Sequence, residues 1–264
     1  MRFQDWNLLP SRVSNQTSLI LDLLDRYDVK GTFFILGWVA HRHPALIRQI
    51  ASRGHEIGCH SYAHRLVYEL TPDAFREDTL QAVKAISDAT GVSPVIYRAP
   101  SYSITKQSLW ALDILVESGF TYDSSIYPIL HDRYGMPGSE RHAHILWMDS
   151  GPICEVPIAT VHVSGSVAPV GGGGYLRMLP YVYTAAGIRR INAEGQPACI
   201  YLHPWEIDPE QPRIVNGLIA RARTYTGLRG MAGKLARLLA DFRFAPMTQV
   251  HPGIDSAVQS ARTS

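Results

Sequence analysis

Long apolar runs are missing from this chain of 264 residues. None reaches the roughly 18 residues that a membrane-spanning helix needs, so we expect no transmembrane segment. The first residues, MRFQDWNLLPSRVSNQ, lack the apolar core of a secretory signal peptide, and the three cysteines are too few for a disulfide framework. These absences favour a protein of the reducing cytoplasm.

A strong excess of either charge is also missing. Lys and Arg number 25 against 23 Asp and Glu, which leaves a net charge of +2. This balance argues against a surface built to bind nucleic acid or an anionic membrane. Hydrophobic residues make up 46% of the chain, which is enough for a large core, and the 11 histidines point to chemistry at a site.

Three common nucleotide and metal motifs are missing as well. The run TFFIL (32–36) is followed by GWVA rather than by G-x-G-x-x-G, which excludes a dinucleotide fingerprint. The four glycines 171–174 are not followed by G-K-[ST], so we interpret them as a flexible or tightly turned loop rather than a P-loop. His55 and Glu56 do not begin an H-E-x-x-H motif, because Cys59 stands where the second histidine would be.

Short β-rich runs alternate with amphipathic segments along most of the chain. This order predicts an α/β fold in which parallel strands are joined by crossover helices, as a barrel or as an open, doubly wound sheet. Strands are expected at 32–36, 56–60, 95–98, 120–123, 153–156 and 198–202, and helices at 18–27, 44–53, 72–90, 105–118, 180–192 and 231–241. The expected buried stripe of the helix 72–90 is Phe75, Leu80, Val83 and Ile86.

Polar or ionisable residues stand at the carboxyl ends of four expected strands. They are His60, Arg98, Asp123 and His203. In parallel α/β folds this edge of the sheet is where sites are built. One such histidine alone is more often structural, but the four together indicate a functional site.

The segment His60-Ser61-Tyr62-Ala63-His64 is the sharpest local signal. If the chain turns helically here, both imidazoles lie on one face and can reach a single ion. Imidazole suits zinc, cobalt, nickel or iron, but two ligands are fewer than the three that a catalytic metal site normally has. The histidine pair therefore suggests a metal site without completing it.

The other three strand ends suggest groups that act beside such a pair. Arg98 could hold a carboxylate through its fixed donors, or could form a structural ion pair. His203 follows an apolar strand and stands near Trp205, which could wall a pocket. Asp123 could accept a hydrogen bond from His203 and so support it as a general acid.

The motifs TFFILG, HEIGCHSYAH, YRAP, YDSS and YLHPWE occur in the order seen in one known family. In these blocks the sequence resembles the polysaccharide deacetylases of the NodB-homology type, carbohydrate esterase family 4. The blocks span roughly residues 15–210. HRLVYE, SLWALDIL, PVGGGGYLRMLP and YLHPWEIDPEQPR look more narrowly like the exosortase-associated deacetylases of bacterial exopolysaccharide clusters.

This resemblance implies a distorted (β/α) barrel that removes N-acetyl groups from a polysaccharide or a lipid-linked oligosaccharide. It implies a divalent metal, zinc or else cobalt or nickel, held by an Asp and two His. By position, His60 and His64 are the metal ligands and His203 is the general acid. Arg98 orients the base, and Asp123 supports His203, although YDSS departs from the commoner fourth motif. The backbone N–H after Pro100 helps to hold the oxyanion.

The family's first motif, an Asp pair that ends a strand before TFFIL, has no counterpart in the sequence as given. Asp5 has no strand before it and is not assigned this role. We therefore expect the barrel to lack its first strand, and the site to lack its base and third metal ligand, through a start placed too far downstream or a truncation. Two other functions stay open: hydrolysis of small amides on the same fold, and glycan binding without catalysis.

The expected organisation is a single deacetylase domain over residues 12–250. Its core spans 15–210, an extension spans 211–250, and residues 251–264 form a flexible tail. The expected partner is an N-acetylated glycan, with no nucleic acid. The sequence indicates no oligomeric state.

Overall fold

The computed structural model describes residues 3–8, 10–131, 134–252, 258 and 260. The chain forms two units, each assembled from segments distant in sequence. The first unit contains Met1–Val29 and Ile158–Phe244, and the second contains Lys30–Pro157 and Ala245–Ser264. A single domain over residues 12–250 stays a prediction, and the tail predicted over 251–264 lies mostly outside the described residues.

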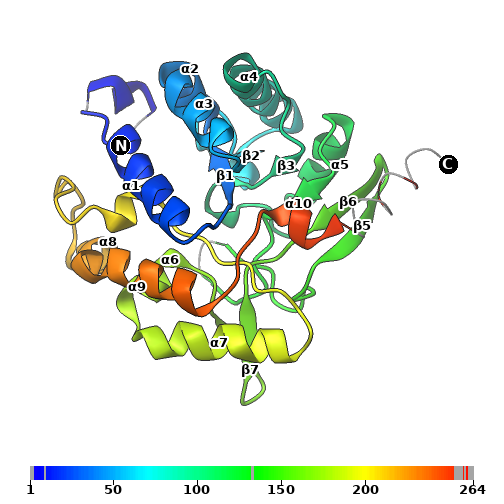
Figure 1. Cartoon of the computed structure of the whole chain (residues 1–264). Helices are drawn as coiled ribbons and strands as arrows, with labels where there is room; N and C mark the ends of the chain where they lie inside the picture. The colour runs from blue at the N-terminus through cyan, green and yellow to red at the C-terminus, as the bar shows by residue number, and fades with distance from the viewer. Residues whose placement is uncertain (1–2, 9, 132–133, 253–257, 259, 261–264) are drawn as a thin grey trace. The chain divides into compact units, whose positions relative to one another are not determined.

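The second unit contains a six-stranded sheet with the order β1-β2-β3-β4-β6-β5 (Figure 1). All neighbours pair in parallel except β5 and β6, which are antiparallel. The strands are β1 (Thr32–Ile35), β2 (Glu56–Cys59), β3 (Ile96–Tyr97), β4 (Tyr122–Asp123), β5 (His144–Met148) and β6 (Gly151–Glu155). The predicted α/β class is therefore confirmed, and β1 lies at one end of the described sheet.

The strand register aligns the carboxyl ends of the parallel strands in a single row across the sheet. The aligned residues are Ile35, Cys59, Tyr97, Asp123 and Glu155. His60 and Arg98 directly follow two of these positions. The register thus places these two side chains and Asp123 along the same edge of the sheet.

The helices of this unit are α2 (Gly37–Arg42), α3 (Pro44–Ser52), α4 (Pro72–Thr90), α5 (Trp110–Glu117) and α10 (Met247–Val250). Short 3-10 turns lie at η2 (Val67–Glu69) and η3 (Pro100–Tyr102). Helices α2, α3 and α5 each pack against α4, and Figure 1 shows α3, α4 and α5 in a row. This layer supports the sheet and leaves the carboxyl ends of the strands to the loops.

The longest helix begins and ends on the signals that its sequence carries. Thr71 accepts a hydrogen bond from the N–H of Ala74, and Gly91 takes a left-handed conformation with φ 79° just past the end. The predicted buried stripe is wrong at Leu80, which is 48% exposed. The inward face carries Asp78 instead, because that position lies one helical turn from the buried Phe75.

The first unit is mainly helical. It contains η1 (Phe3–Leu8), α1 (Val13–Arg26), α6 (Gly173–Met178), α7 (Tyr181–Ala193), η4 (Pro204–Ile207), α8 (Leu218–Tyr225), α9 (Leu228–Asp241) and a hairpin of β7 (Thr160–Val163) and β8 (Ser166–Pro169). The strand predicted at 198–202 is wrong, since this stretch joins no sheet. Its hydrogen bonds go to non-strand residues instead: Cys199 O accepts from Ala159 N, and Tyr201 N donates to Gly171 O.

The glycine run 171–174 is a closely packed segment rather than a flexible loop. A Cβ on Gly171 would lie 2.4 Å from the carbonyl oxygen of Cys199, and one on Gly173 would lie 2.0 Å from Oε2 of Glu206. Gly173 and Gly174 form the first turn of α6. Gly171, Gly172 and Gly173 therefore allow close approach of neighbouring atoms, and the loop predicted for the whole run is wrong at Gly173 and Gly174, which are helical.

Within the part of the chain that the structure describes, no helix is both long and apolar enough to cross a membrane.

Candidate active site

The rings of His60 and His64 lie next to each other after β2. Their centroids are 5.2 Å apart, in an edge-to-face arrangement. The chain does not turn helically here: Ser61 (φ 63°) and His64 (φ 54°) both have left-handed backbones. The two imidazoles meet because of this tight, strained loop, and such strain is concentrated at functional sites.

Asp78 on α4 holds the loop in place. Its carboxylate accepts the backbone N–H of Tyr62 at 2.7 Å and that of Ala63 at 3.3 Å. Burial raises the pKa of Asp78, although these two N–H groups and the charge of Arg65 act in the opposite direction. The loop depends on an acid that comes from a different element.

The first turn of α2 and Ser61 complete the support of this loop. The N–H groups of Gly37 and Trp38 donate to the carbonyls of Ser61 and Tyr62. The Ser61 hydroxyl accepts from the N–H of His64 at 3.0 Å. Both sides of the loop backbone are thereby fixed, which preorganises the histidine pair.

The orientation of His60 is set by a backbone carbonyl. Nδ1 of His60 lies 2.7 Å from the carbonyl oxygen of Arg98. A carbonyl only accepts, so Nδ1 carries the hydrogen and Nε2 is the nitrogen with the lone pair. This is the arrangement usual for a histidine that binds a metal through Nε2.

The described residues fit a divalent metal only in part. His60 and His64 offer two adjacent imidazoles, one of them with its tautomer fixed. Across residues 3–8, 10–131, 134–252, 258 and 260, no group of three or more His, Cys, Asp and Glu side chains is arranged to hold a metal. The pair therefore fits as two ligands of a larger set.

Arg98 is buried and packed across the ends of β3 and β4. Its Nε donates to the Ser124 carbonyl at 3.0 Å and its Nη2 to the Ser124 hydroxyl at 2.7 Å. The guanidinium carbon lies 4.1 Å from the centre of the Phe34 ring. These contacts fix the position of the guanidinium, while its role toward a catalytic base stays a prediction.

Asp123 is fully buried and paired with a second acid that the sequence did not suggest. Its carboxylate is hydrogen bonded to Glu155, which stands opposite it in the register, and to the Ser125 hydroxyl at 2.5 Å. Burial raises the pKa of Asp123, and burial together with the Asp123 charge raises that of Glu155 well above its usual value. Glu155 therefore carries the proton of this pair.

The turn after β3 is also strained. Ser101 and Tyr102 have φ of 52° and 53°, and Ser103 ties the turn down by donating to Pro100 O at 2.6 Å. The backbone N–H after Pro100 belongs to this fixed turn. Its predicted contact with an oxyanion stays a prediction.

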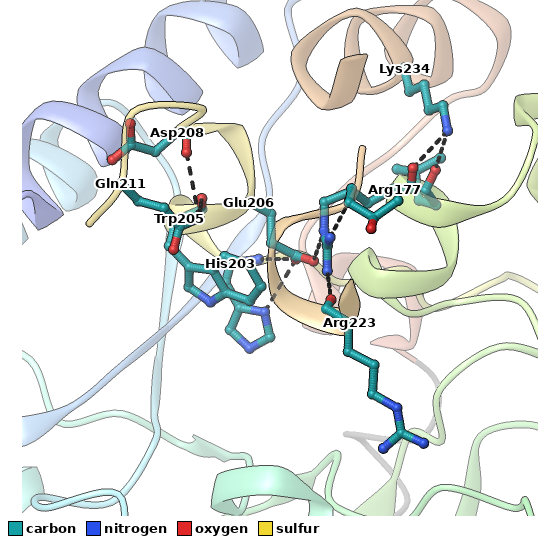
Figure 2. Close-up of polar contacts among 10 residues, drawn as sticks. Arg177, His203, Trp205, Glu206, Asp208, Gln211, Arg223 and Lys234 are labelled. Carbon is teal, nitrogen blue, oxygen red and sulfur yellow. Dashed lines mark hydrogen bonds and ion pairs between the residues drawn. The ribbon is translucent and has the colours of Figure 1, made fainter. Parts of the chain in front are cut away.

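His203 belongs to the first unit and precedes η4. Its side chain is 47% exposed, and its ring is stacked on that of Trp205 with centroids 5.8 Å apart. Glu206 accepts the His203 backbone N–H at 2.9 Å and lies 3.3 Å from its Nδ1 (Figure 2). The carboxylate described beside His203 is thus Glu206, and support by Asp123 stays a prediction.

Glu206 is buried against the guanidinium of Arg177, at 3.4 Å. Burial alone would raise the pKa of Glu206, but its hydrogen bonds with His203 and the charge of Arg177 outweigh burial and lower it. Arg177 also donates to the carbonyls of Arg223 and Thr226. The buried ion pair between Arg177 and Glu206 therefore lies next to His203.

Sequence reasoning missed Asp78, Glu155 and Glu206. Asp78 carried a signal, since an acid at an inward position of an amphipathic helix needs a partner. Glu155 ends an apolar strand in the same way as Asp123 does. Glu206 stands three residues after His203, at the capping-box spacing.

Comparison with known families divides the chain into two parts. Residues 4–122 match the family described as polysaccharide deacetylase, and residues 124–252 match a domain of unknown function (DUF3473). The boundary falls directly beside Asp123. The histidine loop and Arg98 lie within the first match, and His203 lies within the second.

Two curated relatives are deacetylases. A peptidoglycan-N-acetylglucosamine deacetylase of Bacillus cereus is 29% identical over 47% of this chain and 48% of its own length. The deacetylase PgdA of Listeria monocytogenes, described in the same words, is 36% identical over 36% of this chain and 20% of its own. The chain thus spans about half or less of the relatives it matches.

Solved structures share the fold over most of the chain. A protein from Mycobacterium smegmatis assigned as a polysaccharide deacetylase covers 94% of this chain and 78% of its own, with a TM-score of 0.65 and 24% identity. The PuuE allantoinase covers 94% and 74%, with a TM-score of 0.62 and 18% identity. Residues 4–122 of this chain, which include the histidine loop, therefore match the polysaccharide deacetylase family, and the fold of the chain is that of these solved structures.

Proposed function

We propose that this protein is a hydrolase that removes N-acetyl groups from a glycan with the help of a divalent metal. The observation that carries the proposal is the fixed histidine pair, in which His60 is held by Arg98 O while His64 lies beside it. The deacetylase relatives support N-acetylglucosamine in a polymer as the substrate class. An exopolysaccharide or a lipid-linked oligosaccharide and a cytoplasmic location are the finer parts of this proposal.

His60 and His64 would hold the metal, and zinc suits imidazole ligands, with cobalt or nickel as alternatives. Such a metal supplies Lewis acidity to an amide carbonyl when bound. Arg98 keeps His60 in its ligand tautomer through its carbonyl and would orient the base through its guanidinium. His203, whose ring is exposed, would give a proton to the leaving amine.

Release of acetate from an N-acetylglucosamine oligomer in the presence of zinc tests this proposal. We expect His203→Ala to lower kcat by about 10²–10⁴-fold, since general acid catalysis contributes that much. We expect His60→Ala and His64→Ala to abolish binding of zinc in a titration. His41→Ala, at an exposed position of α2, is the matched control and should change neither.

The alternatives give different results in the same assays. Hydrolysis of a small cyclic amide without release of acetate from any glycan would favour small-amide hydrolysis. Binding of the glycan without turnover at saturating zinc would favour the non-catalytic function. Turnover that survives His203→Ala unchanged would contradict the role given to this residue.

A further inference from the structure

One oxygen of a buried carboxylate holds both the backbone and the ring of His203. Oε2 of Glu206 accepts the His203 N–H at 2.9 Å and lies 3.3 Å from Nδ1 of the ring. Glu206 is 1% exposed, whereas the side chain of His203 is 47% exposed. Figure 2 shows the carboxylate of Glu206 between His203 and Arg177.

We propose that Glu206 is a positioning residue for His203, which fixes the hydrogen of the imidazole on Nδ1 and makes Nε2 the nitrogen that exchanges a proton with the substrate. The identity of the proton acceptor, an amine that leaves an amide, rests on the proposed function. The positioning itself rests on the contacts of the first unit.

The chemistry follows from what each group can donate. An ionised carboxylate only accepts hydrogen bonds, so the atom of His203 that faces it must be an N–H. In the protonated imidazolium the second hydrogen is then on Nε2. When that proton passes to the amine nitrogen, the amine gains the proton, the ring becomes neutral, and the Nδ1–H contact with Glu206 is kept throughout.

Arg177 holds Glu206 in place and, together with the larger effect of the His203 hydrogen bond, favours its ionised form. This guanidinium is buried, lies 3.4 Å from Oε1 of Glu206 and is anchored by the carbonyl of Arg223 at 2.5 Å. A buried carboxylate without a cation beside it would take up a proton, and could then donate to Nδ1 and reverse the tautomer. The orientation of His203 therefore depends on a second residue that does not touch its ring.

The segment after His203 is built to keep this geometry. Asp208 forms a two-bond ion pair with Arg12, whose Nη2 donates to Oδ1 at 2.8 Å. Gln211 donates to the carbonyl of Trp205 at 3.0 Å, which closes the turn. These bonds fix the backbone of this segment, while the side chain of His203 stays 47% exposed.

A residue that only caps η4 would act on the backbone and not on the ring, and the two roles can be separated by experiment. Long-range ¹H–¹⁵N correlation spectra of the whole protein report which nitrogen of an imidazole carries the hydrogen, and His203→Gln assigns the signal. We expect the wild-type protein to show the Nδ1–H tautomer at His203. We expect Glu206→Ala to shift the ring toward the Nε2–H tautomer and to lower kcat about 10²-fold with little change in KM.

Glu206→Asp keeps a negative charge beside Arg177 and so protects the fold, but withdraws the carboxylate from Nδ1 by one carbon–carbon bond. It should shift the tautomer in the same direction as Glu206→Ala. Glu210→Ala, at an exposed acid of the same segment, is the matched control and should leave the His203 signal unchanged. A Nδ1–H tautomer that persists in both Glu206 variants would overturn the proposal.

The spectra do not depend on the substrate. If the wild-type protein releases no acetate while the tautomer shifts as expected, the proposed function fails and the positioning stands. If acetate is released but neither the tautomer nor kcat responds to Glu206, the positioning fails alone.

Discussion

Asp123 and Glu155 stand opposite each other on the parallel strands β4 and β6, and their fully buried carboxyl groups are hydrogen bonded to each other. Two ionised carboxylates cannot form such a bond, so one proton is shared by the pair. Oε1 of Glu155 accepts the N–H of Ile126 at 3.0 Å. A protonated acid thus lies in the same row of strand ends as the residues before Arg98 and the histidine loop.

This pair makes the stability of the protein depend on pH. Burial and the Asp123 charge raise the pKa of Glu155 well above its ordinary value of 4.5. The folded state therefore holds more protons than the unfolded state, and the free energy of unfolding falls as the pH rises from about 4.5 through the raised pKa. We expect Glu155→Gln to remove this fall, because a Gln amide donates to Asp123 and accepts from Ile126 at every pH.

Thermal unfolding measured from pH 5 to pH 9 checks this prediction. Relative to the wild-type protein, Glu155→Gln should gain stability as the pH rises, by about 1.4 kcal/mol for each unit by which the pKa is raised. Glu117→Gln, at an acid on the outer face of α5, should not change the slope in this direction. A wild-type slope that is unchanged in Glu155→Gln would show that the pair does not hold the proton.

The histidine loop should fail when its support on α4 is removed. Asp78→Ala leaves the N–H groups of Tyr62 and Ala63 without their acceptor, so we expect a loss of about 1–3 kcal/mol in the free energy of unfolding. The loop would also lose its fixed shape, and zinc affinity should fall about 10–100-fold, as for other residues that orient metal ligands. Urea unfolding and zinc titration measure the two effects.

Asp88→Ala is the control on the same helix. Asp88 forms an exposed ion pair with Lys84 one turn away, and its loss should cost about 0.5 kcal/mol or less. Zinc affinity should not change. Equal effects of the two substitutions on zinc binding would contradict the role of Asp78.

The sequence predicts well which residues lie at the carboxyl ends of the parallel strands, because these positions depend on local patterns. Short β-rich runs that end in a polar residue mark β2 and β4, and the polar residue then lies at the strand end. His60 and Asp123 are found in this way. The hairpin of β7 and β8 also carried a signal, since Ser164-Gly165 is a two-residue turn with positive φ at both positions.

The partners of these residues could not be predicted in the same way, because they come from distant parts of the chain. Asp78 reaches the histidine loop from α4, and Arg177 reaches Glu206 across 29 positions. The segment 198–202 looks like a strand by composition, yet its hydrogen bonds go to a loop. Tertiary packing decides which segments become neighbours. The periodicity of hydrophobic residues along the sequence does not encode this packing.

We expect the segment 245–252 to exchange its amide hydrogens faster when the carboxylate of Glu56 is removed. This carboxylate accepts the N–H groups of Met247 at 3.0 Å and Thr248 at 3.4 Å, as well as the Thr32 hydroxyl at 2.5 Å. Without it, the partly buried N–H of Thr248 loses its acceptor and that of Met247 keeps only the Thr32 hydroxyl, at a cost of about 1–3 kcal/mol. Hydrogen exchange of residues 245–252 should accelerate in Glu56→Ala and stay unchanged in Glu77→Ala, an exposed acid of α4.

Two neighbouring glycines should respond in opposite directions to the same substitution. A Cβ on Gly173 would lie 2.0 Å from Oε2 of Glu206, so Gly173→Ala must displace the carboxylate from His203 or shift α6. We expect a loss of about 1–3 kcal/mol, as for other overpacked sites. A Cβ on Gly174 meets nothing within 4 Å, and alanine there should stabilise the first turn of α6 by up to about 1 kcal/mol. Thermal unfolding of both variants measures the difference, and the spectrum of His203 should change in Gly173→Ala alone.

A Gly173→Ala variant as stable as Gly174→Ala would mean that Glu206 does not occupy the space beside this glycine.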